Sequence, residues 1–391
     1  MAQEPSNRLA TRCVHAGEID DPHGSPHTPL YTATTFAFPD TESILATVEG
    51  RGSESLYSRY GMNPTTRSLE AKLASLEDAG AALAFASGMA AETALFLTHG
   101  RGGVICVGDA YGGTLELLAD YLPNMGIPTH FVLGDELDRL DALLAEGAGL
   151  VFVETPTNPA LEVFDIAALA EQAHAHHALL AVDNTFATPV NQRPLALGAD
   201  VVVHSATKYL GGHSDLTAGA LMATPELLGP VWDWRKALGS APDPRTCDLL
   251  ARSLRTLVVR VRQQTAGATA IAEAMAAHPG VARVLYPGLA DFPGHDLAAR
   301  QMAGFGGMLT LELAGDAAAT AAVADRLTLF ALAPSLGGAD SLVTQPVTTT
   351  HHGLDPEDLN RRGISGAMLR LSVGLEDPSD LIADLEQALA G

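Results

Sequence analysis

The feature that most constrains the fold of this chain is the alternation of short, continuous apolar runs with helical segments between residues 81 and 224. Strands that are apolar on both faces and separated by helices are typical of a parallel sheet covered by helices on both sides. The runs that we interpret as strands lie at residues 82–87, 103–109, 150–156, 178–184, 200–205 and 218–224. The pattern therefore predicts an α/β fold with a mostly parallel sheet flanked by helices.

The chain has 391 residues, enough for one large domain or two. Residues 1–60 are rich in Pro, Gly, Ser and Thr and predict an extended N-terminal arm, which needs another surface to lie on. We predict a large α/β domain over residues 61–250, closed by a long helical stretch at about 246–278. In residues 251–391 the regular alternation ends, which predicts a smaller C-terminal α+β domain.

Composition excludes several classes of partner. The chain has 23 Lys+Arg against 46 Asp+Glu, a formal net charge of −23, which argues against nucleic acid or an anionic membrane as a partner. The cysteines form no CxxC pair, so neither a metal site nor a disulfide framework is expected. No apolar run reaches membrane-spanning length, and the N-terminus has no hydrophobic signal region. We therefore expect a cytoplasmic protein that acts on a small molecule.

Polar residues follow several of the predicted strands. Because ligands bind beyond the carboxyl ends of strands in such sheets, we expect these residues to converge on one edge. Ser87 begins a helix whose free N–H groups can bind an anion. Asp183 supplies a carboxylate and Tyr111 an aromatic ring. The other polar or turn residues at this edge are Gly88, Met89, Glu154, Asn158, Thr185, Ser205 and Thr207.

Lys208 is the least expected residue of this edge. A lysine at the mouth of a buried strand loses water and gains little unless a reaction uses its amine. Pyridoxal 5′-phosphate (PLP) requires a lysine amine, an anion site for its phosphate and a carboxylate for its pyridine nitrogen. Each residue alone has an ordinary explanation, such as a turn cap at Asp183. Their joint occurrence favours PLP as the cofactor, with Lys208 as its Schiff-base lysine.

The motifs of the chain resemble those of the Cys/Met-metabolism (trans-sulfuration) family of fold-type I PLP enzymes, in family order over most of the sequence. The family includes cystathionine γ-synthases, cystathionine γ-lyases, cystathionine β-lyases, methionine γ-lyases and homoserine-ester sulfhydrylases. The matching segments are YSRYGMNPT (57–65), ASGMAA (86–91), DAYGGT (109–114), ETPTNP (154–159), VDNTFATP (182–189), HSATKYLGGHSD (204–215), PSLGGADSL (334–342) and LRLSVGLED (369–377).

The resemblance implies a role for each residue. Lys208 is the Schiff-base lysine and proton shuttle, Asp183 pairs with the pyridine nitrogen, and Tyr111 stacks on the ring and assists proton transfer. The remaining contacts to the cofactor are implied at Ser87, Gly88, Met89, Thr185, Ser205 and Thr207. Tyr57 and Arg59 reach the phosphate of a neighbouring subunit, which implies a homo-oligomer, a tetramer built as a dimer of dimers with shared active sites.

The substrate site follows from the same resemblance. Arg370 is the clamp for the substrate α-carboxylate, a task that suits a guanidinium. Asn158 and Ser335 line the same pocket, as does Asp340, which stands where several γ-acting members have Glu. Gly113 stands where methionine γ-lyases usually have Cys, and this disfavours that activity.

The resemblance implies γ-elimination or γ-replacement on sulfur amino acids or homoserine esters, as in a cystathionine γ-lyase or γ-synthase. A β-lyase, a methionine γ-lyase or a sulfhydrylase is the alternative within the family. From other classes, a nucleotide-binding oxidoreductase and a non-catalytic homologue stay open. The absence of a GxGxxG motif argues against the first, and the presence of Lys208 and Asp183 argues against the second.

Overall fold

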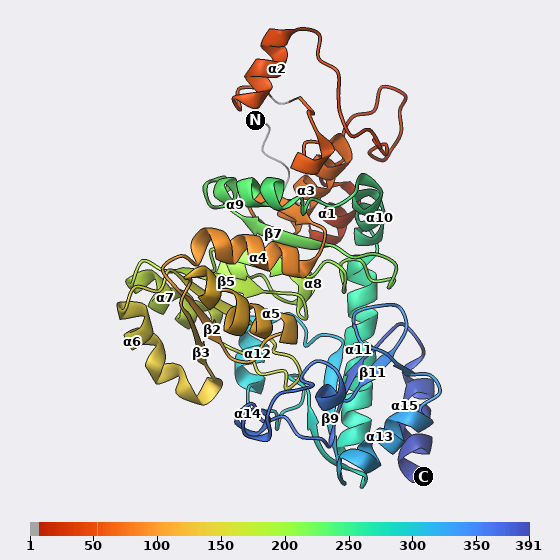
Figure 1. The fold of residues 1–391 in the computed structure, drawn as a ribbon. Helices are drawn as coiled ribbons and strands as arrows, with labels where there is room; N and C mark the ends of the chain where they lie inside the picture. The colour runs from red at the N-terminus through yellow and green to blue at the C-terminus, as the bar shows by residue number, and fades with distance from the viewer. Residues whose placement is uncertain (1–7, 53) are drawn as a thin grey trace.

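The structure is a computed structural model that describes residues 8–52 and 54–391 (Figure 1). Within these residues the larger sheet has seven strands in the order β1-β7-β6-β5-β4-β2-β3. The strands are β1 (Ala81–Phe85), β2 (Val104–Val107), β3 (Thr129–Val132), β4 (Leu150–Glu154), β5 (Leu179–Asp183), β6 (Val201–His204) and β7 (Gly219–Ala223). β7 runs antiparallel to β1 and β6, and the other neighbouring strands are parallel. The predicted mostly parallel α/β sheet is confirmed.

Helices cover both faces of this sheet because successive strand side chains point to opposite faces. On one face lie α4 (Gly88–His99) and α9 (Pro225–Leu238). On the other lie α3 (Pro64–Leu76) and α10 (Pro244–Leu254). The remaining helices of this half are α5 (Gly112–Glu116), α6 (Leu140–Ala145), α7 (Ile166–Ala175) and α8 (Thr188–Asn191), with helical turns at Leu117–Tyr121, Pro123–Met125, Gly134–Arg139 and Pro194–Leu197.

The N-terminal arm contains two helices, α1 (Leu9–His15) and α2 (Thr41–Val48), and a short turn at Ser58–Tyr60. Residues 1–7 and 53 of the predicted arm lie outside the described part of the chain. The segment that bears α2 extends away from the rest of the molecule (Figure 1). The prediction of an extended arm did not include these helices, although Asp40 marks the start of α2 by accepting a hydrogen bond from the Ser43 N–H at 2.7 Å.

The C-terminal half contains a second sheet, of five strands in the order β10-β11-β12-β9-β8. Its strands are β8 (Val281–Leu285), β9 (Met308–Leu313), β10 (Ala331–Leu332), β11 (Leu342–Thr344) and β12 (Met368–Ser372). Its helices are α12 (His295–Gln301), α13 (Ala317–Arg326), α14 (Pro356–Arg361) and α15 (Pro378–Ala390), with a helical turn at Pro346–Thr348. This sheet and the C-terminus lie at the end of the molecule opposite the arm (Figure 1).

The long helix α11 (Leu257–Ala276) joins the two halves. Its first residues, such as Val261, belong to the core against the larger sheet, and its later residues, such as Ile271, belong to the core of the smaller sheet. The single helical stretch expected at about 246–278 is instead two helices, because the chain leaves α10 at Leu254 and starts α11 at Leu257. The expected boundary after residue 250 falls inside α10, so we propose that the two halves divide along α11.

Among the described residues, the structure contains no helix that is both long and apolar enough to cross a membrane.

Candidate active site

The predicted site residues follow strands that end on the same edge of the larger sheet. β2, β4, β5 and β6 are parallel, and β1 points the same way because the intervening β7 is antiparallel to both of its neighbours. The connection from β6 to β7 therefore also lies at this edge, and it contains Lys208. Asp183 and Glu154 are partners in the register of β4 and β5, so their backbones lie side by side.

The first turn of α4 is a candidate anion site. Ser87 caps the helix by accepting a hydrogen bond from the Ala90 N–H at 3.1 Å, while the earlier N–H groups have no partner within the helix. Glycines allow the surrounding backbone to approach. A Cβ on Gly219 would lie 2.0 Å from the Ser87 carbonyl oxygen, and one on Gly88 would lie 2.9 Å from the Cβ of Ser205. Ser205 is thereby held against the start of α4.

Thr185 and Thr207 organise the loops beside this anion site. The Thr185 hydroxyl accepts a hydrogen bond from the Ser205 N–H at 2.8 Å, which joins the ends of β5 and β6. The Thr207 hydroxyl donates to the Ala218 carbonyl at 3.1 Å and accepts from the Ala218 N–H at 3.0 Å. Both threonines therefore shape the loops, and Thr207 keeps one free lone pair for a further donor.

Asp183 is buried at the end of β5, where its Oδ1 accepts a hydrogen bond from the Thr185 N–H at 2.8 Å. Burial raises the pKa of Asp183 above its usual value. Glu154 is buried next to it, and burial followed by the charge of Asp183 raises the pKa of Glu154 well above its usual value. Two adjacent buried carboxylates of this kind are stabilised by a cationic ligand.

Glu92 is a third buried carboxylate, and sequence reasoning missed it. It lies on α4, where its Oε2 accepts a hydrogen bond from the Thr114 hydroxyl at 2.6 Å. Burial, and then the negative charge of Asp183, raise the pKa of Glu92 to about 8. The signal in the sequence is a single acidic residue inside the apolar run GMAAETALFL. This run forms α4, whose apolar residues pack against the sheet.

These features fit PLP. The helix start with its glycines suits a phosphate, and the surplus of buried carboxylates at Asp183 suits a protonated pyridine nitrogen. Tyr111 follows β2 and is 48% exposed, so its ring is open to a ligand. Its backbone N–H donates to Glu154 Oε2 at 2.9 Å, which fixes the turn at this edge. Met89 lies in the same first turn of α4, against the turn that carries Tyr111.

Lys208 and Arg370 meet at Ser335. The Lys208 Nζ donates to the Ser335 hydroxyl at 2.8 Å, and the Arg370 guanidinium donates to the Ser335 carbonyl at 3.0 Å. Burial, followed by the charge of Arg370, lowers the pKa of Lys208 to about 8. The structure thus brings together a lysine from the larger sheet and an arginine from β12 of the smaller one.

Arg370 is buried and is oriented by Asn158, whose Oδ1 accepts a hydrogen bond from it at 2.9 Å. Burial lowers the pKa of Arg370 to about 10. Its Nε is buried without a hydrogen-bond partner among the described residues, which leaves one donor for a ligand. Ser335 has a φ of 100°, a strained backbone conformation for a residue other than glycine. Asp340 lies farther along the same loop and is exposed.

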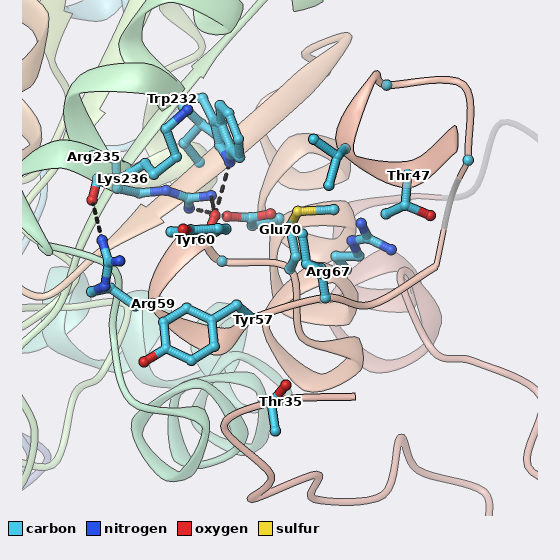
Figure 2. Close-up of a pocket in the computed structure, with 17 residues that line it drawn as sticks. Thr35, Thr47, Tyr57, Arg59, Tyr60, Arg67, Glu70, Trp232, Arg235 and Lys236 are labelled. Carbon is cyan, nitrogen blue, oxygen red and sulfur yellow. Dashed lines mark hydrogen bonds and ion pairs between the residues drawn. The ribbon is translucent and has the colours of Figure 1, made fainter. Parts of the chain in front are cut away.

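The structure does not bring Tyr57 and Arg59 to Lys208 within one chain. The Arg59 guanidinium donates to the Lys236 carbonyl at 2.9 Å and lies over the rings of Tyr57 and Tyr60, at 5.4 and 4.8 Å from their centroids. These residues line a cavity of about 920 Å³ between the arm and α9 (Figure 2). Figure 2 shows Trp232 and Arg235 converging on the Tyr60 carbonyl, which fixes the turn that carries Arg59.

Comparison with known proteins gives matches over nearly the whole chain. The model of the family described as Cys/Met metabolism PLP-dependent enzyme matches residues 10–390. A cystathionine γ-synthase of Mycobacterium leprae is 41% identical, over 97% of this chain and 96% of that protein. A cystathionine γ-lyase of Dictyostelium discoideum is 40% identical, over 100% of this chain and 99% of that protein.

A solved structure gives the same result for the fold. The cystathionine γ-synthase of Xanthomonas oryzae pv. oryzae, in complex with aminoacrylate and cysteine, superposes with a TM-score of 0.91 at 38% identity. The match covers 99% of this chain and 98% of that chain.

Proposed function

The chain belongs to the Cys/Met metabolism family of PLP-dependent enzymes, and from that membership we infer that it is a trans-sulfuration enzyme. It is a PLP-dependent carbon–sulfur lyase or transferase that catalyses γ-elimination or γ-replacement, as cystathionine γ-lyases and γ-synthases do. Its substrate is a small amino acid. The single observation that best supports this chemistry is the meeting of Lys208 and Arg370 at Ser335, because it places a weakly basic amine beside a carboxylate-binding guanidinium.

Several residues of this chain would hold the cofactor. The N–H groups at the start of α4, with Ser205, would bind its phosphate, Asp183 would accept a hydrogen bond from its ring nitrogen, and Tyr111 would cover its ring. When bound, PLP supplies an aldehyde for an amine and a ring that withdraws electrons from the substrate α-carbon. Because Asp183 is buried and held by Thr185, its carboxylate would have one fixed orientation toward that nitrogen.

Lys208 would be the residue that moves protons. With a pKa of about 8, roughly a tenth of the amine is neutral at pH 7, whereas an ordinary lysine is almost fully charged there. A neutral amine can accept a proton, and a base whose pKa is close to the working pH is the most effective. A γ-elimination needs protons removed from both the α- and the β-carbon, and the position of Lys208 allows one amine to serve both.

Arg370 would orient the substrate. A carboxylate can bind the free Nε, while Asn158 and the Ser335 carbonyl hold the other side of the guanidinium. This contact fixes the carboxylate end of the substrate, so that the α-carbon faces Lys208. The shared partner, Ser335, therefore sets the distance between the clamp and the base.

The active unit that we propose is a homo-oligomer, a tetramer built as a dimer of dimers, in which Tyr57 and Arg59 serve the phosphate site of a neighbouring subunit. Two observations support it. Arg59 lies on a cavity of about 920 Å³ rather than at its own chain's Lys208, and apolar residues of the arm, including Leu45 and Val48 of α2, are exposed.

Identification of the products tests the function. The purified protein is incubated separately with cystathionine, homocysteine, methionine, and O-succinylhomoserine plus cysteine. We expect 2-oxobutyrate from elimination, or cystathionine from the last mixture. Pyruvate from cystathionine would identify a β-lyase instead, and release of a thiol from methionine would identify a methionine γ-lyase. A protein that binds PLP but forms none of these products would refute the proposed activity.

A further inference from the structure

The turn that carries Tyr111 is held by two buried carboxylates. Asp109 Oδ1 accepts a hydrogen bond from the Ala110 N–H at 3.0 Å, and Glu154 Oε2 accepts one from the Tyr111 N–H at 2.9 Å. The Tyr111 side chain is itself half exposed. The position of its ring therefore depends on the backbone of the turn. Because Asp109 holds this backbone, the ring position also depends on the residues that bind the Asp109 carboxylate.

Asp109 is held by two residues that are distant in sequence. His351 Nε2 lies 3.1 Å from Asp109 Oδ2, and the Arg362 guanidinium donates to Asp109 Oδ1 at 2.6 Å. Asp109 and His351 are buried, and the Arg362 side chain is 13% exposed. Both partners come from residues 346–362 of the C-terminal half, so one carboxylate joins this segment to the turn.

The segment also touches the turn through its backbone. A Cβ on Gly112 would lie 2.3 Å from the Thr350 carbonyl oxygen, so a side chain at that position is excluded. The Thr350 hydroxyl lies 2.9 Å from His351 Nδ1, and this contact sets the orientation of the imidazole toward Asp109. The two halves therefore meet at Asp109 and Gly112 of the turn and at Thr350, His351 and Arg362 of the segment.

A buried ionic cluster of this kind contributes little net stability compared with apolar residues of similar volume, since each charge loses its water. The cluster does more to fix the position of the turn than to stabilise the fold. A charged hydrogen bond is directional, and loss of one partner leaves a buried charge unpaired. The cluster lies two residues from Tyr111, so a small displacement of the turn would move the aromatic ring.

We propose that Asp109, His351 and Arg362 form a clamp that positions Tyr111 over the active site, an inference that rests on the role proposed above for Tyr111. The three residues are positioning residues, because they act through the turn, and within the described part of the chain Lys208 and Arg370 hydrogen-bond to Ser335 and Asn158 instead. The clamp makes the geometry of the ring depend on correct packing of the 346–362 segment.

The chain supplies matched controls for the test. His352 follows His351 but is exposed, and its Nδ1 lies 3.3 Å from the Val347 carbonyl. Arg361 precedes Arg362 but is half exposed and pairs with Glu136. The variants His351→Gln and Arg362→Met are compared with His352→Gln and Arg361→Met. Each protein is purified as the PLP-bound enzyme, and kcat, KM, the visible spectrum and the unfolding temperature are measured.

We expect the two clamp variants to lower kcat about ten-fold, since misplacement of a catalytic group by a fraction of an ångström has effects of this order, with a smaller change in KM. The visible band of the bound cofactor should shift, because the ring above it has moved. The control variants should keep the wild-type values. Arg362→Lys, which can still reach Asp109, should recover part of kcat, and this variant also decides the question if Arg362→Met does not fold.

A double-variant cycle with Tyr111→Ala separates the clamp from a general structural role. If the clamp acts through Tyr111, Arg362→Met should lower kcat by less than about two-fold in the Tyr111→Ala background. An equal loss in both backgrounds would overturn the clamp. So would a wild-type spectrum and kcat in Arg362→Met while Tyr111→Ala is impaired. Wild-type activity of Tyr111→Ala itself would overturn the role of Tyr111, and the clamp with it, without affecting the assignments of Lys208 and Arg370.

Discussion

The carboxyl edge of the larger sheet differs from the cavity beside the arm in how fully its key residues are held by partners within one chain. At the edge, Lys208, Asp183 and Arg370 each have hydrogen-bond partners within the chain, and burial has altered their pKa values. At the cavity, Arg59 is held by a backbone carbonyl and by two aromatic rings, around a large open volume. This difference supports our proposals that the edge performs the chemistry and that a second chain completes the cavity.

The largest expected effect comes from the edge. Lys208→Ala removes the amine that accepts the substrate protons, so we expect turnover to fall by about 10⁴-fold, the upper range for a general base. The variant should lose the absorbance near ~420 nm that a lysine-bound cofactor gives. Its unfolding temperature should not fall, because a buried amine with a lowered pKa costs the fold rather than supports it. A yellow variant with residual turnover would assign the base to another residue.

A somewhat smaller effect is expected for Asp183→Asn. The amide is similar in shape but cannot stabilise a protonated ring nitrogen, so turnover should fall about 100- to 1,000-fold, as when one electrostatic contact to the transition state is lost. Glu154→Gln is the matched comparison, since Glu154 is buried beside Asp183 and binds the Tyr111 N–H. We expect a smaller loss of turnover in Glu154→Gln. Equal losses in the two variants would mean that the two buried carboxylates act only through their total charge.

Much of the edge could be predicted from the sequence, because strand order and direction place strand-end residues such as Ser87, Asp183 and Lys208 together whatever the details of packing. Contacts between elements were not predictable. The carboxylate of Glu92 meets Thr114 only because α4 lies against the Tyr111 turn. The contact between Asp109 and His351 joins residues 242 positions apart, and nothing local to either residue indicates it.

The arm was harder to predict for a different reason. Its weak periodicity concealed α1 and α2, because each has few buried residues: Cys13 in α1 and Thr47 in α2. The roles of Tyr57 and Arg59 came from family resemblance alone, and a single chain leaves them away from Lys208. A site shared between subunits cannot be deduced from the propensities of one chain, since its geometry belongs to the assembly.

The cavity is tested by complementation. Arg59→Ala should weaken retention of the cofactor about ten-fold or more, the effect of losing one charged contact to a phosphate. Arg67→Ala, in the same cavity lining, is the comparison. Mixed and refolded Arg59→Ala and Lys208→Ala chains should regain about a quarter of the wild-type activity, because half of the random dimers contain one intact site. Hybrid dimers without recovered activity would place Arg59 outside the partner's site.

The smallest effect is a pH dependence that only the edge should show. The pKa of Lys208 is lowered to about 8 by burial and then by Arg370, so the neutral fraction of the amine should rise through pH 8 and level off by about pH 9. The apoenzyme is mixed with PLP, and the Schiff base is trapped by borohydride. The rate of attachment should rise roughly ten-fold from pH 7 to 9 and then stay constant, whereas an ordinary lysine would gain about 100-fold and continue to rise.

Variants test the cause of this profile. Arg370→Met removes the neighbouring positive charge, which makes the protonated amine less unfavourable, so the midpoint of the pH profile should move to higher pH. Arg361→Met should leave the midpoint unchanged, because Arg361 pairs with Glu136 and does not contribute to the pKa of Lys208. A rate that still rises above pH 10 in the wild type would show that the amine is solvated and that the contrast between the two regions is smaller than the structure indicates.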